Sequence, residues 1–224
     1  CNSFAAEFDL NDADMMALER ASTLPEGRAI GHYINPSIYQ KLAKVFGRET
    51  GLQLDLFQYR SPIIIINMIA EAQFRNDEVY PLDHALYRIA KSNGKLMLGL
   101  ETFEDQLQVF SKLSIEEQAR TLKKIATHFS AYRQEIIRAE VLYRSRDIQK
   151  LYKKTKKSNG SMRKVLLYDR NQTMVHQFME FAQYNSIFAA VGAGHLAGAK
   201  GMLRLLKQKG YQVRPVYYDE DDNN

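Results

Sequence analysis

The chain has 224 residues, 45% of them hydrophobic, which is enough to bury a substantial core in one domain. Its single cysteine, Cys1, excludes an internal disulfide and a cysteine-rich zinc module, so any metal would be bound by histidine and carboxylate side chains. The net charge of +5 is modest and falls largely between residues 144 and 164, which we interpret as a solvated basic face, and we expect no nucleic-acid partner. No stretch approaches the roughly 20 apolar residues of a transmembrane helix, and no signal peptide is visible.

The N-terminal segment predicts the strand-to-helix unit of α/β proteins. Residues 3–8 form a short apolar run closed by Asp9, which is typical of a buried strand. Asn11 is a candidate N-cap for a helix that continues to about Ala21, with Asp14 three residues on.

Between residues 34 and 93 the apolar spacing predicts helices. Residues 62–74 are ambiguous, because four consecutive isoleucines favour a strand, whereas Pro62 at a first turn and the alanines that follow favour a helix. We choose a buried helix. A second strand over residues 95–100 then leads into a helix capped by Thr102.

The next region predicts a helical hairpin of approximately residues 113–157, inserted into the α/β core. Ser114 caps its first helix, and apolar residues then recur at steps of three and four. Residues 158–161 predict a loop that ends the insertion, and a helix over residues 165–181 follows.

The C-terminal part predicts a strand-helix-strand unit. A third strand over residues 186–191 is followed by a glycine-rich turn over residues 192–201, a helix that carries Met202, and a last strand over residues 211–217. Crossovers of this kind are right-handed and imply parallel pairing. We therefore predict a single α/β domain, residues 1–224, in which helices flank a central, mainly parallel sheet.

Polar side chains lie at or just past the ends of three predicted strands: Glu7, Glu101 and His195. Because loops converge at the carboxyl ends of parallel strands, we expect these side chains to lie close together and form a site. Gly192 and Gly194 are candidate cofactor-binding residues, since glycine lets the backbone approach a ligand.

Each of these side chains also has a structural interpretation. Spacing alone leaves His195 open between a capping histidine in a glycine turn and a neutral imidazole at a helix N-terminus that ligates a metal or accepts a proton. Glu101 is equally open between a helix-start carboxylate and a functional acid or base. A charge on Glu7, within an apolar strand, is costly, so this residue should have a cationic partner, a metal or a raised pKa. Arg170, followed by Asn171, is a candidate for that cation.

The segments that contain these residues resemble motifs of the TraB/GumN/Tiki family. They are Phe4-Ala-Ala-Glu-Phe-Asp9, residues 98–106, Asp169-Arg-Asn171 and residues 188–216. They occur in the family's order over nearly the whole chain, and the resemblance implies functional roles for Glu7, Glu101, Arg170 and His195.

The family pattern contains two Gly-x-x-His motifs, of which this chain has the second, Gly192 to His195. Since the chain begins with Cys1 rather than Met, we expect the first motif to lie on a strand upstream, inside a longer gene product.

The resemblance implies a metal-dependent hydrolase of peptide or small-molecule substrates, in a periplasmic or other extracytoplasmic location. A divalent metal, Mn, Co or Zn, would be held by His195 and the upstream histidine with help from Glu101, and would activate water. Glu7 or Glu101 would act as general base, and Arg170 would stabilise an oxyanion or bind a substrate carboxylate. The alternative is a non-catalytic ligand-binding or haem-binding regulatory protein.

Overall fold

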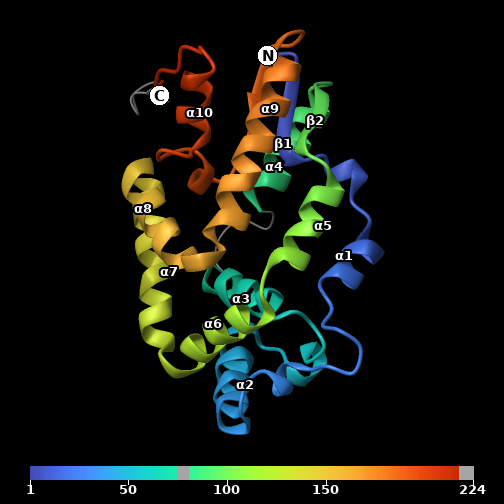
Figure 1. The fold of residues 1–224 in the computed structure, drawn as a ribbon, viewed down its shortest axis with the longest axis vertical. Coiled ribbons are helices and arrows are strands. Elements are labelled where there is room, and N and C mark those ends of the chain that lie inside the picture. The colour runs from blue at the N-terminus through green and yellow to red at the C-terminus, as the bar shows by residue number, and fades with distance from the viewer. Residues whose placement is uncertain (75–80, 217–224) are drawn as a thin grey trace.

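The computed structural model describes residues 1–74 and 81–216, and within these ranges it contains one sheet surrounded by helices (Figure 1). The strands are β1 (Ser3–Phe8), β2 (Leu96–Glu101) and β3 (Ile187–Ala189). The α-helices are α1 (Met15–Ala21), α2 (Pro36–Thr50), α3 (Pro62–Glu71), α4 (Leu82–Ser92), α5 (Phe103–Lys112), α6 (Ile115–Thr127), α7 (Phe129–Arg144), α8 (Ile148–Asn159), α9 (Arg170–Ala182) and α10 (Met202–Gln208).

The three strands are parallel, in the order β2-β1-β3. On one face of the sheet, Ala5 packs with Met174 of α9 and Met202 of α10. On the other face, Phe4 packs with Tyr87 of α4. The predicted class, a parallel sheet flanked by helices, is therefore confirmed.

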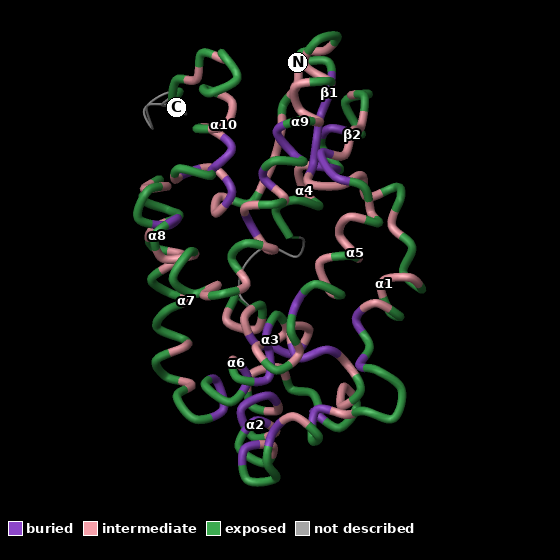
Figure 2. Tube along the Cα trace, viewed as in Figure 1, coloured by how far each residue is buried: buried purple, intermediate pink, exposed green. Residues whose placement is uncertain are grey.

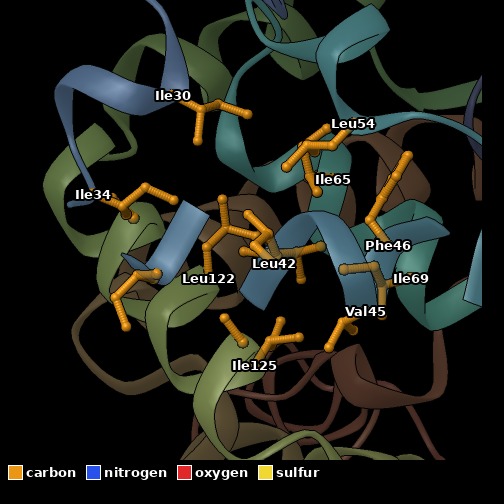
Figure 3. Close-up of a cluster of buried hydrophobic side chains, with 14 of the residues drawn as sticks. Ile30, Ile34, Leu42, Val45, Phe46, Leu54, Ile65, Ile69, Leu122 and Ile125 are labelled. Carbon is orange, nitrogen blue, oxygen red and sulfur yellow. The ribbon is translucent and has the colours of Figure 1, made fainter. Parts of the chain in front are cut away.

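A second hydrophobic core lies beyond the carboxyl ends of the strands, where α2, α3 and α6 pack together (Figures 1 and 3). Leu42 and Phe46 of α2 are fully buried there, as are Ile65 and Ile69 of α3. The isoleucine run is helical, as predicted, because the spacing of Ile65 and Ile69 puts both on one face of α3 against its neighbours. Figure 2 shows the resulting division, with buried segments in the sheet and in this helical core.

Gln118 of α6 links this helix to the first turn of α3 through hydrogen bonds. Its side chain is buried, and Oε1 accepts from Ser61 Oγ at 2.7 Å and from the Ile63 backbone N–H at 2.9 Å. Its Nε2 donates to the Leu113 carbonyl at 3.2 Å. Because Ser61 makes no side-chain cap of its own, Gln118 satisfies the first turn of α3 from another helix.

We expect Gln118→Ala to lower the free energy of unfolding by about 2 kcal/mol, because it leaves buried hydrogen-bonding groups without partners. Urea unfolding followed by circular dichroism measures this loss. The exposed Gln134→Ala on α7 is the control and should change stability by less than about 0.5 kcal/mol. Equal effects of the two variants would contradict the role of Gln118.

Three local predictions from the sequence are wrong: the start of the first helix, the number of helices over residues 113–157, and the loop at residues 158–161. The helix predicted from Asn11 is divided in two: Asp9 caps a short 3-10 turn that contains Asn11, and Asp14 caps α1 through the N–H groups of Met16 and Ala17. Residues 113–157 form three helices, α6 to α8, rather than the two of a hairpin.

The predicted loop at residues 158–161 is largely helical, since α8 runs to Asn159 and a 3-10 turn begins at Gly160, whose φ is +52°.

The last predicted strand, residues 211–217, is not a strand over residues 211–216, and residue 217 lies outside the described residues. After Tyr211, whose N–H donates to the Leu206 carbonyl, no backbone ladder pairs this segment with the short β3 in the described part of the chain. Among the described residues, none of the helices combines the length and hydrophobicity needed to cross a membrane.

Candidate functional site

The predicted site residues come together at one edge of the sheet, as expected. Glu7 is the next-to-last residue of β1, and Glu101 ends β2, in register with Phe8. The Gly192 to His195 turn follows β3. The carboxyl ends of three parallel strands therefore deliver two carboxylates and an imidazole to one place.

Arg170, the first residue of α9, joins the two carboxylates. Its Nε donates to Glu101 at 2.9 Å, and its Nη2 donates to Glu101 at 2.7 Å and to Glu7 at 2.6 Å. One π-helical turn, Lys164–Asp169, precedes α9, and such irregular turns often occur next to functional residues. The cationic partner required for Glu7 is thus Arg170.

Burial and ion pairing set the charges in this cluster. Burial acts to raise the pKa of Glu7, but His195 in its protonated form, the Arg170 guanidinium and the Gly192 N–H outweigh burial and hold that pKa below its usual value. Burial raises the pKa of Glu101, whose side chain is only 2% exposed, and Arg170 offsets part of this rise. Glu7 is consequently the more readily ionised carboxylate.

His195 is buried and held by Asn171. Asn171 Nδ2 donates to the Lys200 carbonyl at 2.7 Å, so its Oδ1 is the atom that faces His195 Nδ1 at 2.6 Å. An amide oxygen only accepts, so Nδ1 carries the proton and Nε2 holds a free lone pair. That Nε2 lies 3.8 Å from Glu7 Oε1.

The helix N-terminal position considered for a neutral His195 is wrong, although the neutral state is supported. His195 lies in a 3-10 turn, Ala193–His195, and α10 begins only at Met202, so the imidazole is not at that helix's N-terminus. Burial instead lowers its pKa to about 4, against the opposing effect of Glu7.

The glycines of the turn permit close approach to the site. Gly192 N–H donates to Glu7 Oε1 at 2.8 Å, and a Cβ at this position would lie 3.2 Å from the same oxygen. A Cβ at Gly194 would lie 3.1 Å from Thr155 of α8. Their role as cofactor-binding residues stays a prediction.

Two supporting residues were not among the predicted site residues. Asn171 orients His195, and Gln106 of α5 donates from Nε2 to Glu101 Oε2 at 2.6 Å. Both lie inside the segments that carried the family resemblance, residues 169–171 and 98–106, which was the signal that could have identified them.

The donor atoms fit a metal only in part. His195 Nε2 faces Glu7 Oε1, which accepts one hydrogen bond, from the Gly192 N–H. Both Glu101 oxygens accept from Arg170, and Glu101 Oε2 accepts from Gln106 as well. No group of three or more His, Cys, Asp or Glu side chains within residues 1–74 and 81–216 is arranged to hold a metal ion. The described residues therefore offer two facing ligand atoms, His195 Nε2 and Glu7 Oε1.

The fold and the site define an α/β protein with a buried arginine, carboxylate and histidine cluster at the carboxyl ends of a parallel sheet. The chain belongs to the TraB/PrgY/gumN family, whose model matches residues 1–215.

The chain is similar to two curated proteins, both called Metalloprotease TIKI2. It is 22% identical to that of Xenopus tropicalis over 271 aligned positions, covering 95% of this chain and 51% of the relative. It is 23% identical to that of Danio rerio over 269 aligned positions, covering 95% and 52%. The chain thus spans about half the length of these relatives. No solved structure matches it.

Proposed function

We propose that this protein is a metal-dependent hydrolase whose metal is held by His195 Nε2 and Glu7. The observation that carries the proposal is the free Nε2 lone pair 3.8 Å from Glu7 Oε1. Ligand bonds of about 2.0–2.2 Å allow one ion to touch two atoms at that separation. The relatives named metalloproteases support the same class of chemistry.

Each neighbouring residue has a distinct task in this proposal. Asn171 fixes the tautomer and the direction of the imidazole. Arg170 keeps Glu7 ionised and in place, and Glu101 holds the guanidinium. When bound, the metal supplies a water of lowered pKa as the nucleophile.

Catalytic zinc sites commonly use three protein ligands. His195 and Glu7 are the two that we propose in the described residues.

We expect the full-length protein to bind Mn, Co or Zn and to hydrolyse a peptide or an ester only when the metal is present. In His195→Ala, metal affinity should fall at least about 100-fold. Removing a residue that only hydrogen-bonds to a metal ligand already lowers metal affinity about 10- to 100-fold. Hydrolysis should be lost with it. Isothermal titration calorimetry measures the first effect, and a fluorogenic assay measures the second.

His176→Ala is the matched control, since this exposed histidine of α9 pairs with Glu180 one helical turn away. It should leave both metal affinity and hydrolysis unchanged. Undiminished hydrolysis in His195→Ala would remove the proposed site.

A further inference from the structure

A cavity of about 920 Å³ opens beside Glu7, between the sheet edge and the helices α4, α7 and α8. Its volume is in the range of sites that take small organic ligands. Glu7 and Gly192 of the proposed catalytic cluster are part of its wall. A ligand in this cavity would therefore reach the Glu7 carboxylate directly.

The walls of this cavity are mainly aliphatic. From α7, Ile136 and Ala139 lie three residues apart and contribute to the same wall. Other parts of the wall are formed by Leu10, Leu86, Leu151 and Leu196. No residue of α7 is buried, so the apolar residues of this helix are less closely covered than those of the helical core.

Three of the polar side chains in the wall are already bonded within the protein. Thr155 Oγ1 donates to the Leu151 carbonyl at 3.0 Å. Glu140 Oε1 accepts from Arg144 Nε at 2.6 Å, and Asp83 Oδ1 accepts from the His84 N–H at 2.9 Å. Each of these three groups is therefore bonded within its own helix in the absence of a ligand.

The backbone that borders the cavity is also engaged. Ala190 N–H donates to the Ala5 carbonyl at 2.8 Å, and Gly192 N–H donates to Glu7. The Gly192 carbonyl accepts from His195 N–H at 2.8 Å. An extended peptide carries one N–H and one C=O per residue that must find partners when buried, and this wall has few to offer.

We propose that the cavity holds a linear acyl chain, and that the substrate is an acyl ester whose carbonyl carbon lies beside Glu7, the carboxylate that faces His195. This inference rests on the proposed function. In the reaction, the oxygen of water bonds to the acyl carbon, the bond from that carbon to the alkoxy oxygen breaks, and one proton of water passes to the leaving alcohol. The products are a carboxylic acid and an alcohol.

Chain binding is tested first, without metal and without catalysis, by calorimetry with 1-octanol and 1-decanol. Each buried methylene contributes about 0.8 kcal/mol, so two more methylenes should tighten binding about 15-fold. Ala139→Trp, which fills the cavity from α7, should weaken decanol binding at least tenfold. Leu86→Trp fills it from α4 and should do the same, and thermal unfolding curves check that both variants are folded.

Ile137→Trp is the matched control, because Ile137 is a neighbouring, 44% exposed residue of α7 that does not line the cavity. It should bind decanol like the wild type. Equal affinity for the two alcohols, no effect of either cavity-filling variant, or tighter binding of a capped tri-leucine peptide than of decanol would each overturn the acyl-chain assignment.

Hydrolysis separates this inference from the proposed function. With metal added, 4-nitrophenyl decanoate should be cleaved with a higher kcat/KM than 4-nitrophenyl acetate, and Ala139→Trp should remove the preference. Metal-dependent cleavage with no chain-length preference overturns the acyl chain and leaves the hydrolase standing. If decanol binds but neither ester nor any peptide is cleaved, the proposed hydrolase function is overturned. The assignment of the acyl chain as part of a substrate is then overturned with it.

Discussion

Arg170→Met is expected to lower the free energy of unfolding by about 3–5 kcal/mol, the usual cost of removing one partner from a buried ion pair. Arg170 is 14% exposed and bonds to Glu7 and Glu101, the latter 2% exposed. Without the guanidinium, two carboxylates share a poorly solvated site with no cation between them. Arg170→Lys should recover only part of the loss, because an ammonium cannot reproduce the planar contact with Glu101. Chemical denaturation of the metal-free protein measures both.

The control for this variant is Arg144→Met. Arg144 is 72% exposed and pairs with Glu140 one helical turn away, so its loss should cost only about 0.3–0.5 kcal/mol. A cost below about 1 kcal/mol for Arg170→Met would show that the cluster contributes little to stability.

The same variant should change the dependence of stability on pH. Burial raises the folded-state pKa of Glu101 and Arg170 opposes the rise, so removing Arg170 raises that pKa further. Such a carboxyl contributes its full stabilisation only below its unfolded pKa of about 4.3, and this contribution is lost as pH rises through the folded pKa. The deficit of Arg170→Met relative to wild type should therefore be larger at pH 7 than at pH 4.

The strands and most helices could be predicted because their signals are local. The apolar run at residues 3–8 and the Thr102 cap with Asp105 each depend on residues that are neighbours in sequence, and both are confirmed. The strand predicted over residues 211–217 depends on a partner far away in sequence. Since β3 has only three residues, local β-propensity could not decide that pairing.

The sequence predicted where the site lies in the fold, but not which hydrogen bonds and ion pairs join its residues. Parallel strands bring their carboxyl ends together by topology, so the meeting of Glu7, Glu101 and His195 followed from the order of elements. The cost of a buried charge predicted a partner for Glu7, but that partner is 163 positions away, so the residues alone left Arg170 a candidate until the structure placed it beside Glu7. The roles of Asn171 and of burial at His195 likewise depend on packing, which spacing does not encode.

Gly201→Ala is expected to lower the free energy of unfolding by about 3 kcal/mol, through a steric conflict with the backbone. Gly201 has an ordinary φ of −79°, so the conformation itself is not strained for alanine. A Cβ there would instead collide with the carbonyl groups of Ala197 and Leu196, which cannot rotate away as a side chain can. Leu203 N–H also donates to the Leu196 carbonyl, so relief of the collision must move the start of α10 or the turn that follows His195.

The effect of Gly201→Ala should extend from stability to metal binding, because Leu196 is bonded directly to His195 in the chain. Calorimetric metal titration of the folded variant should show weaker binding than wild type, in parallel with the loss measured by urea unfolding. Gly31→Ala is the matched control: a Cβ there meets nothing within 4 Å, so stability should stay the same or rise by up to about 1 kcal/mol. If Gly201→Ala were as stable as Gly31→Ala, the turn would be loosely packed, and the placement of His195 beside Glu7 would not depend on it.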